Sequence, residues 1–449
     1  MRVGVILSSQ ISKTYPFGEL KGIALFILCV LYKLLRSSAQ EVPSVPIPER
    51  HSPKLLILLV DGFRWDYFER QKHQLPGFRQ LISNGIQVEY VEPIFPSLSF
   101  PSWNTLVTGV YPENHNILGN YMLFLGDDEF PESVFHLKDN STQLAWWWQS
   151  AEPLWITATK AGHKSYLANF CRCDVPYEGI QPTECTGYMY QDVNFKLREH
   201  LNKAMSRFRQ GYSLAMIYDD SIDHAGHAWG PDSNEIRVAL ARIDTILQEM
   251  FITMKYHGLY DKVNIIITSD HGMTSIKKDS GVEYIKLSDY VNPDEIYKVI
   301  DYGAVVSIAV LEGKVDSVYN QVASIPGLDA YRKNDIPEEF HYKKSKLVHD
   351  ILLVAKPGYF IVGLKGEKQI PMDAKSSSVQ PYAGSHGYYN SSEMRTIFFA
   401  SGPAFKKGIV HPVIGLEDEY QIFARVLELQ PCPNNGTWAR VNDMLVEAG

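Results

Sequence analysis

The chain has 449 residues, of which 45% are hydrophobic and 21% are charged, so it can form two or three domains or one large domain with insertions. Its 43 basic and 51 acidic residues give a formal net charge of -8, which argues against a partner that is a nucleic-acid polymer, because phosphate backbones are bound by basic surfaces. The five cysteines are too few for a scaffold that depends on disulfides.

The N-terminal segment predicts export. Residues 22–32 form an unbroken apolar run preceded by basic residues. This run is too short to cross a bilayer, which takes about 20 residues, so we interpret residues 1–39 as a signal peptide or a signal anchor, with a buried core helix as the alternative. Residues 40–50 contain three prolines and predict a linker. We therefore expect an extracellular protein that is secreted or tethered to the cell-surface membrane.

Sequons and cysteines agree with an oxidising compartment outside the cytoplasm. Three Asn-X-Ser/Thr triplets begin at Asn140, Asn390 and Asn435. Cys173 and Cys185 would close a short loop as a disulfide, although all cysteines after the N-terminal segment could also be free. Cys171 and Cys432 could be paired or free.

Residues 51–445 alternate apolar runs with helical segments. Short apolar runs bounded by turn residues predict strands buried on both faces, and they lie at 54–61, 213–219, 262–270, 304–311 and 395–401. Apolar residues at helical spacing predict a helix over 234–257, with Asp232 as its N-cap. Buried strands that alternate with helices predict an α/β domain, with a mostly parallel sheet and helices on both faces.

Polar side chains follow three of these runs, and another lies in a later Gly/Ser-rich turn. They are Asp61, Asp223, His227, Asp270, His271 and His386. Ligands of such sheets bind beyond the carboxyl ends of the strands, so we expect these residues at one edge. Each alone is more often a turn, cap or surface residue. Together, carboxylates and imidazoles without thiolates suit zinc or another borderline divalent cation.

Ser99 is the candidate nucleophile. It precedes Phe100 and Pro101 at the start of a predicted helix, and proline suits a first helical turn. Free N–H groups and the dipole at a helix N-terminus favour an anion such as a phosphoryl oxygen. On local grounds alone, an N-cap role for Ser99 is the simpler interpretation, and Ser97 competes as the nucleophile.

Six motifs carry a resemblance to a known family: DGFR at 61–64, FPSLSFP at 95–101, LVTGVYPENHNILGN at 106–120, DHAGHAWGP at 223–231, SDHGMT at 269–274 and SHG at 385–387. In combination they resemble the ectonucleotide pyrophosphatase/phosphodiesterase family of the alkaline phosphatase superfamily, over about residues 54–445. The resemblance implies an alkaline-phosphatase-like catalytic domain with an inserted cap region at about 276–380.

The resemblance also implies the cofactors and the mechanism. Two zinc ions are expected, one on Asp223, His227 and His386 and the other on Asp61, Asp270 and His271. Ser99 would contact the metals and attack phosphorus to form a phospho-serine intermediate, and Asn120 would donate to a phosphoryl oxygen. A backbone N–H near Phe100 would assist Asn120. A complete ligand set disfavours the alternative of an inactive cell-surface interaction protein.

Within the family, further segments resemble members that hydrolyse glycerophosphocholine: PSLSFP around Ser99, GNYM at 119–122, SAEPLWIT at 150–157 and YKKSK at 342–346. The spacing of Cys173 and Cys185 also matches a short disulfide loop of those members. The resemblance therefore implies a small phosphodiester or lysophospholipid substrate, such as glycerophosphocholine or lysophosphatidylcholine. A membrane contact through the N-terminal segment is compatible with this substrate class, and no oligomeric state is predicted.

Aromatic residues separate the choline interpretation from the alternative, a nucleotide pyrophosphatase/phosphodiesterase. Nucleotide-cleaving members stack the base between two aromatic faces, and here Phe100 offers one face while the partner position holds Ala168 or Asn169. Phe100, Tyr121 and Tyr218 are predicted to surround a quaternary ammonium group by cation–π contacts. Each of these rings could instead be core packing.

Overall fold

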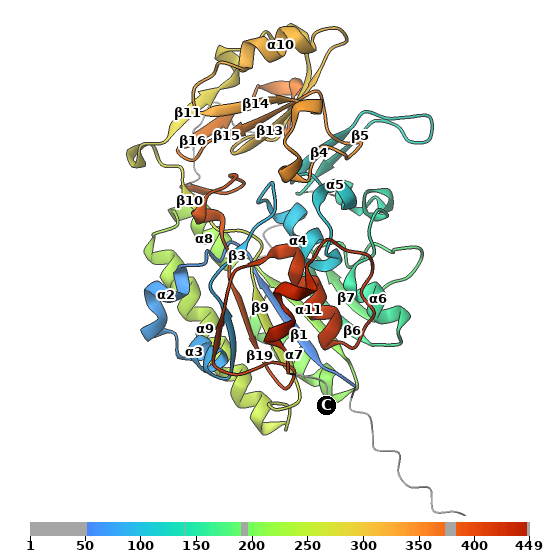
Figure 1. Ribbon diagram of the computed structural model, residues 1–449, viewed down its shortest axis with the longest axis vertical. Helices are drawn as coiled ribbons and strands as arrows, with labels where there is room; N and C mark the ends of the chain where they lie inside the picture. The colour runs from blue at the N-terminus through green and yellow to red at the C-terminus, as the bar shows by residue number, and fades with distance from the viewer. Residues whose placement is uncertain (1–51, 139, 190–195, 373–382, 447–449) are drawn as a thin grey trace, which may run out of the picture. The chain divides into compact units, whose positions relative to one another are not determined.

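The computed structural model describes residues 52–138, 140–189, 196–372 and 383–446 (Figure 1). The predicted signal segment at 1–39 and the linker at 40–50 lie outside these residues. Within the described part of the chain, no helix is long and apolar enough to cross a membrane.

A large sheet positions the site residues. It has eight strands in the order β20-β2-β19-β9-β1-β8-β6-β7. The strands β9 (Asn264–Thr268), β1 (Leu55–Val60), β8 (Leu214–Asp219) and β6 (Ser165–Phe170) run parallel to one another. By contrast, β19 (Phe398–Ser401) is antiparallel to β9 and to β2 (Gly85–Val88). The outer strands β7 (Glu184–Gly187) and β20 (Ile409–His411) are parallel to their neighbours. The predicted mostly parallel sheet is confirmed.

Both faces of this sheet are covered, which explains the continuous apolar runs. In β1, residues 55, 57 and 59 join one hydrophobic cluster, whereas residues 56, 58 and 60 join another. The first cluster includes residues of α4 (Ser99–Thr108), α6 (Leu154–Lys160) and α11 (Glu419–Val426). The second includes residues of α3 (Pro76–Ser83), α7 (Leu197–Arg209) and α9 (Asn234–Tyr256) (Figure 1). A strand between two helical layers has no polar face.

Helix α9 matches the helix predicted over 234–257, but the predicted cap is wrong. The N-cap is Ser233, whose Oγ accepts from the N–H of Ile236 at 3.4 Å. The carboxylate of Asp232 instead pairs with the guanidinium of Arg70 at 2.5 Å. The ion pair with Arg70 therefore holds the Asp232 carboxylate away from the N-terminus of α9.

The chain segment between β10 (Thr274–Ser275) and β18 (Gly384–Ser385) forms a second sheet, and this segment lies within the predicted insertion. Its five strands have the order β14-β15-β13-β12-β17 and span Leu328–Arg332, Ile351–Ala355, Val305–Val310, Ile296–Ile300 and Gln369–Ile370. The pair β11 (Glu283–Lys286) and β16 (Tyr359–Val362) and helix α10 (Val315–Val322) belong to the same segment (Figure 1). The apolar run at 304–311 forms β13, which is antiparallel to both neighbours and not part of the large sheet.

Candidate active site

Metal-ligand candidates lie beyond neighbouring parallel strands. Because β9, β1 and β8 are adjacent, their carboxyl ends meet at one edge of the sheet. Asp61 directly follows β1, Asp270 follows β9, and Asp223 lies in α8 (Ser221–Trp229), just after β8. Gly62 has a φ of +69°, and a Cβ there would lie 2.9 Å from the Cα of Asp223. Glycine at this position therefore lets α8 approach the end of β1.

Three histidines share one hydrogen-bonding pattern. The Nδ1 atoms of His227, His271 and His386 lie 2.9, 2.9 and 3.0 Å from the carbonyl oxygens of Gly384, Gly272 and Ser97. A carbonyl oxygen can only accept, so in each ring Nδ1 carries the proton and Nε2 is the unprotonated nitrogen. Metal-binding histidines are oriented by the same kind of contact.

The predicted ligands converge on two adjoining clusters. Ligand atoms of Asp61, Asp270 and His271 lie within 4.8 Å of one another, and so do those of Asp223, His271 and His386. Nε2 of His227 lies 3.4 Å from Oδ1 of Asp223. The rings of His271 and His386 stack with their centroids 3.5 Å apart. His271 thus lies in both clusters, whereas the sequence resemblance assigned it to one.

Two oxygens test whether a metal would fit. Oδ1 of Asp61 and Oδ1 of Asp223 are buried and have no hydrogen-bond partner in the described structure. A buried polar atom without a partner costs about 1–3 kcal/mol, and more when it is charged. A divalent cation would give both oxygens a partner, and a carboxylate–imidazole set suits such an ion. The residues present therefore fit a metal centre.

Burial shifts the clustered groups towards their uncharged forms. It raises the pKa of Asp223 and of Asp270 to about 7. Burial, together with the charge of Asp223, raises the pKa of Asp61 well above its usual range. It also lowers the pKa of His227 to about 4 and that of His386 well below its usual value. Neutral imidazoles and carboxyl groups with raised pKa values are expected at a site where a bound cation stabilises the ionised carboxylates.

Ser99 is the first residue of α4. Leu98, with extended backbone angles (φ -116°, ψ 153°), occupies the N-cap position, so the N-cap interpretation of Ser99 is wrong. The Oγ of Ser99 lies 3.2 Å from Nε2 of His271. Ser99 is half-buried and lines the same cavity as Asp61 and Asp223. This position beside both clusters suits a nucleophile.

The competing serine has a different role. Ser97 is 1% exposed, and its Oγ donates to the carbonyl of Tyr388 at 3.2 Å. Its own carbonyl accepts from Nδ1 of His386 at 3.0 Å. Ser97 therefore orients a metal-ligand candidate, and the geometry favours Ser99 as the nucleophile.

Asn120 lies just before β4 (Tyr121–Phe124) and contacts the start of α4. Its Oδ1 accepts from the N–H of Phe100 at 3.0 Å. The sequence interpretation expected both groups to donate to a phosphoryl oxygen. Because the Phe100 N–H is bound to Asn120, the amide Nδ2 of Asn120 is the group oriented for donation.

Two aromatic side chains hold the carboxylates in place. Nε1 of Trp103 donates to Oδ2 of Asp270 at 2.7 Å, and the hydroxyl of Tyr218 donates to Oδ2 of Asp61 at 2.5 Å. Sequence reasoning missed Trp103, although its position one turn after Ser99 in a helix could have indicated it. Tyr218 lines the cavity as predicted for a substrate contact, but its hydroxyl is bound to Asp61.

A cavity of about 430 Å³ contains Ser99. Asp270 and His271 are fully buried, whereas the other predicted ligands and Asn120 line the cavity. Its aromatic lining is Phe100, Trp103, Tyr121, Tyr188, Tyr218, Tyr302 and Phe360. Asp220 and Asp301 also line it but belong to neither metal cluster.

Phe100, Tyr121 and Tyr218, the three rings predicted to surround a quaternary ammonium group, all line the cavity. Phe100 is 2% exposed, and its ring packs against the rings of Trp103, Phe135, Trp148 and Tyr188. The half-buried Tyr188, which sequence reasoning missed, is edge-on to Phe100, with an interplanar angle of 85° and centroids 5.9 Å apart. Phe100 and Tyr188 therefore do not form two parallel faces for a nucleobase. Ala168 and Asn169 are buried.

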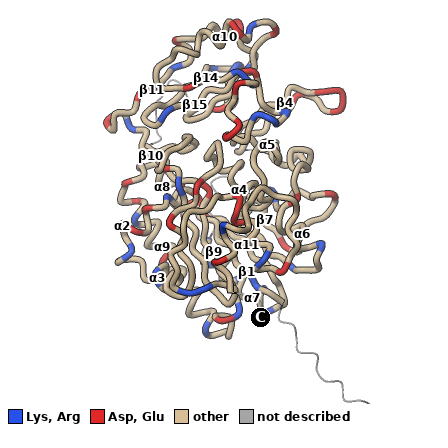
Figure 2. The backbone as a smooth tube through the Cα atoms, in the orientation of Figure 1, with Lys and Arg blue, Asp and Glu red and all other residues tan. Residues whose placement is uncertain are grey.

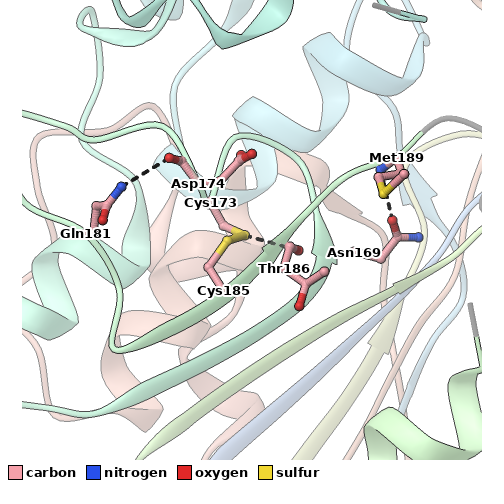
Figure 3. Close-up of a disulfide and its surroundings, with 7 residues drawn as sticks. All are labelled: Asn169, Cys173, Asp174, Gln181, Cys185, Thr186 and Met189. Carbon is pink, nitrogen blue, oxygen red and sulfur yellow. Dashed lines mark hydrogen bonds between the residues drawn. A yellow bond between two sulfur atoms is a disulfide. The ribbon is translucent and has the colours of Figure 1, made fainter. Parts of the chain in front are cut away.

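The predicted disulfide is confirmed. Cys173 and Cys185 are bonded (Figure 3), and they link the turn after β6 to β7. Close to this loop, Oδ1 of Asn169 accepts from the N–H of Met189 at 3.2 Å, which fixes the chain beside Tyr188. Cys171 and Cys432 are both free.

Comparisons with known proteins show which family this chain resembles over most of its length. Residues 55–389 match the family description "Type I phosphodiesterase / nucleotide pyrophosphatase". Ectonucleotide pyrophosphatase/phosphodiesterase family member 5 of Homo sapiens is 32% identical over 399 residues, or 88% of this chain and 78% of that protein. The bis(5'-adenosyl)-triphosphatase of Bos taurus is 33% identical over 402 residues, or 88% of this chain and 82% of that protein.

Two further comparisons extend the similarity. Family member 7 of Mus musculus is 30% identical over 427 residues, or 93% of this chain and 92% of that protein. A solved structure of murine family member 5, an inactive variant in complex with AMP, is 32% identical with a TM-score of 0.78. That alignment covers 88% of this chain and all of the other.

Proposed function

Because the chain belongs to the type I phosphodiesterase/nucleotide pyrophosphatase family, we propose that it is a zinc-dependent phosphodiesterase with Ser99 as its nucleophile. One zinc ion would be held by Asp223, His227 and His386 and the other by Asp61, Asp270 and His271. The observation that carries this proposal is the convergence of Ser99 Oγ, three oriented imidazoles and two unpartnered carboxylate oxygens. Bound zinc supplies a Lewis acid that lowers the pKa of a hydroxyl and offsets phosphoryl charge.

The chain's own groups define the chemical steps. Ser99 Oγ attacks phosphorus and forms a new P–O bond, while the bond to the leaving oxygen breaks. The serine proton passes to solvent, and the leaving oxygen takes a proton from water. Asn120 Nδ2, which the bond from the Phe100 N–H to Oδ1 orients, stabilises charge on a phosphoryl oxygen. Water then cleaves the phospho-Ser99 ester and restores the hydroxyl.

We propose choline-phosphate esters, such as glycerophosphocholine or lysophosphatidylcholine, as substrates. A trimethylammonium group binds to aromatic faces and gains further from a nearby carboxylate. The cavity contains both, since Asp220 and Asp301 add to its aromatic lining. The edge-on contact between Phe100 and Tyr188 also disfavours a stacked base at that position.

Nucleotides are the second candidate substrates. They are favoured by the comparisons, because one relative is named a bis(5'-adenosyl)-triphosphatase and a similar solved structure contains AMP. Both candidates share the same metal centre and nucleophile, so they differ only in the groups that contact the substituents of the phosphate. A third interpretation, an inactive interaction protein, is disfavoured because the ligand candidates and Ser99 are all present.

The substrate proposal is tested by comparing kcat/KM for glycerophosphocholine, lysophosphatidylcholine and a dinucleotide on the zinc-loaded protein. We expect a preference of at least about tenfold for a choline ester, equivalent to about 1.4 kcal/mol in transition-state binding. A dinucleotide preference would overturn the choline assignment and leave the phosphodiesterase proposal intact. Failure to hydrolyse any diester would overturn both.

We also propose an extracellular location, either secreted or tethered through residues 1–39. The Cys173–Cys185 disulfide supports an oxidising compartment. Asn140, Asn390 and Asn435 are exposed and accessible to glycosylation. Figure 2 shows basic and acidic residues interspersed, with acidic residues at the turn between β4 and β5 (Ser133–His136), which agrees with a small-molecule substrate and not a nucleic-acid polymer. A mass decrease after enzymatic deglycosylation of the secreted protein would support export, and recovery only from cytosol would contradict it.

A further inference from the structure

We propose that Asp301, Tyr302 and Phe360 of the inserted segment form, together with Tyr121, the subsite that binds the cationic end of the substrate. These four residues are called the cation subsite. The inference rests on the proposed function, because it assigns the part of the cavity that selects a choline-like group.

Asp301 is held in an unusual conformation at the end of β12. Its φ of +68° lies in the left-handed region, which aspartate adopts more readily than most residues because its side chain can hydrogen-bond locally. Its N–H donates to the carbonyl of Ile370 at 2.8 Å, and its carbonyl accepts from the side chain of Gln369 at 2.9 Å. Its carboxylate accepts from the N–H of Tyr302 at 2.8 Å. Strand β17 therefore fixes the turn that places a carboxylate in the cavity.

Two glycines show how closely this turn approaches the active site. A Cβ on Gly119, the residue before Asn120, would lie 3.9 Å from Oδ2 of Asp301. A Cβ on Gly303 would lie 3.8 Å from Oγ of Ser385, which precedes a metal-ligand candidate. The turn at 301–303 is thus adjacent to both the phosphoryl-binding and the metal-binding sides of the cavity.

The charge of Asp301 is available to a ligand. Asp301 belongs to neither metal cluster, and it pairs with no basic side chain in the described part of the chain. Burial raises its pKa to about 7, so a bound cation would favour its ionised form. Lys138 also lines the cavity but is not among the groups that shift the pKa of Asp301. Bound metals would neutralise the ligand carboxylates, whereas a cationic group of the substrate would stabilise the ionised form of Asp301.

Three aromatic rings, those of Tyr121, Tyr302 and Phe360, line the same cavity as this carboxylate. The ring centroid of Tyr302 is 6.4 Å from that of Tyr121 and 6.3 Å from that of Phe360. Phe360 is fixed beside the turn because Gly303 and Ile361 exchange backbone hydrogen bonds of 2.8 and 2.9 Å. A quaternary ammonium within about 6 Å of ring centroids is attracted to their faces.

The cation subsite is separate from the aromatic group around Phe100. Among the described residues, no ring contact joins Tyr121, Tyr302 or Phe360 to Phe100 or Tyr188. Phe100 packs into the core, and the Tyr218 hydroxyl is bound to a ligand carboxylate. Of the three rings predicted to surround choline, Tyr121 alone therefore belongs to the proposed subsite.

The test compares Asp301→Asn with the parent on two diesters. One is p-nitrophenylphosphocholine, and the other is its uncharged isostere, in which carbon replaces the quaternary nitrogen. Asparagine keeps the acceptor for the Tyr302 N–H but removes the charge. We expect the ratio of kcat/KM for the charged over the uncharged substrate to fall about tenfold. The matched control is Asp329→Asn, an exposed carboxylate of the same sheet that pairs with Lys356, and its ratio should equal that of the parent.

Calorimetric titration of the zinc-loaded protein with choline gives a readout that does not depend on turnover. We expect about tenfold weaker choline binding in Asp301→Asn and weaker binding in Tyr302→Leu, with thermal melts showing that both variants are folded. Parent-like choline binding and an unchanged substrate ratio in these variants would overturn the subsite. If the parent cleaves both diesters equally well, the subsite is wrong and the phosphodiesterase proposal stands. If the parent cleaves neither diester but binds choline through Asp301, the subsite stands and the proposed function fails.

Discussion

The indole N–H of Trp103 donates a hydrogen bond of 2.7 Å to Oδ2 of Asp270, and this bond ties the helix that begins at Ser99 to a metal-ligand candidate. The other oxygen of Asp270 accepts from the backbone N–H groups of Gly62 at 3.2 Å and His271 at 3.0 Å. The carboxylate is therefore held from the ends of β1 and β9 and from α4. The candidate nucleophile and the candidate metal centre thus share one buried support.

Replacing Trp103 by phenylalanine keeps a ring in place but removes this donor. We expect zinc affinity to fall about tenfold, because groups that orient metal ligands typically contribute 10- to 100-fold. Competition with a chromophoric chelator measures the affinity. Trp438→Phe, at a residue that is 36% exposed, is the control and should bind zinc like the parent. Equal affinities in all three proteins would show that the indole contact does not orient Asp270 for metal binding.

Tyr218→Phe tests whether this tyrosine supports the metal site or contacts substrate. Its hydroxyl donates to Asp61, so we expect a loss of about tenfold in kcat/KM that is the same for choline esters and for simple nitrophenyl diesters. Steady-state kinetics on both substrates measures the two losses. Tyr256→Phe, at a surface residue, provides the control. A loss of kcat/KM confined to the choline ester would show that Tyr218 contacts the choline group of the substrate.

The pKa values of the site predict how metal binding changes stability with pH. Asp223 and Asp270 have pKa values of about 7 in the folded chain, against about 4 when unfolded. In the metal-free protein, these two groups lower the free energy of unfolding least below about pH 4, where they are protonated in the folded and the unfolded chain. The free energy of unfolding then falls as the pH rises from about 4 through about 7. Bound zinc stabilises the ionised forms and removes this loss.

The rise in Tm that zinc produces should therefore be larger at about pH 8 than at about pH 5. Scanning calorimetry of matched metal-free and zinc-loaded samples measures this rise. The difference in Tm between the two samples excludes the effect of groups remote from the site, because they titrate equally in both. A zinc-induced shift that is constant or that shrinks between these pH values would contradict the expected linkage.

Arg172 also supports α4, through Asn104. Its buried guanidinium donates to Oδ1 of Asn104 at 2.8 Å and to the carbonyl of Trp148 at 3.2 Å. The amide of Asn104 in turn donates to the carbonyl of Phe100 at 2.9 Å. Lysine cannot reproduce the planar fork, so Arg172→Lys should lower the free energy of unfolding by about 2–3 kcal/mol. Urea denaturation measures this, with the exposed Arg209→Lys as control, and a loss below about 0.5 kcal/mol would show that the contact is dispensable.

The sequence predicts the site well where a candidate metal ligand directly follows an apolar, strand-forming run. The runs at 54–61, 213–219 and 262–270 form neighbouring parallel strands, so the edge that gathers Asp61, Asp223 and Asp270 could be predicted. Pattern alone could not show that β19 is antiparallel or that 304–311 joins another sheet, because a buried strand has the same apolar composition in either direction.

Contacts between distant segments were the features that sequence reasoning missed. Trp103 and Tyr218 resemble ordinary core aromatics, and only the folded structure shows their hydrogen bonds to Asp270 and Asp61. Asp301 lies far from the catalytic motifs in the sequence, and its position depends on pairing between β12 and β17. The cap at Ser233 instead of Asp232 reflects a long-range ion pair with Arg70. Each case is a tertiary contact that overrides a local preference.

The most direct test of the central claim is the turnover of zinc-loaded Ser99→Ala on a choline-phosphate ester, with bound zinc measured by elemental analysis. Ser97→Ala is the matched control, because Ser97 is buried and its Oγ bonds the Tyr388 carbonyl. We predict that Ser99→Ala loses about a thousandfold or more in kcat at parent-like zinc content, and that Ser97→Ala retains most of its activity. Substantial turnover by Ser99→Ala, or a selective loss in Ser97→Ala, would contradict Ser99 as the nucleophile.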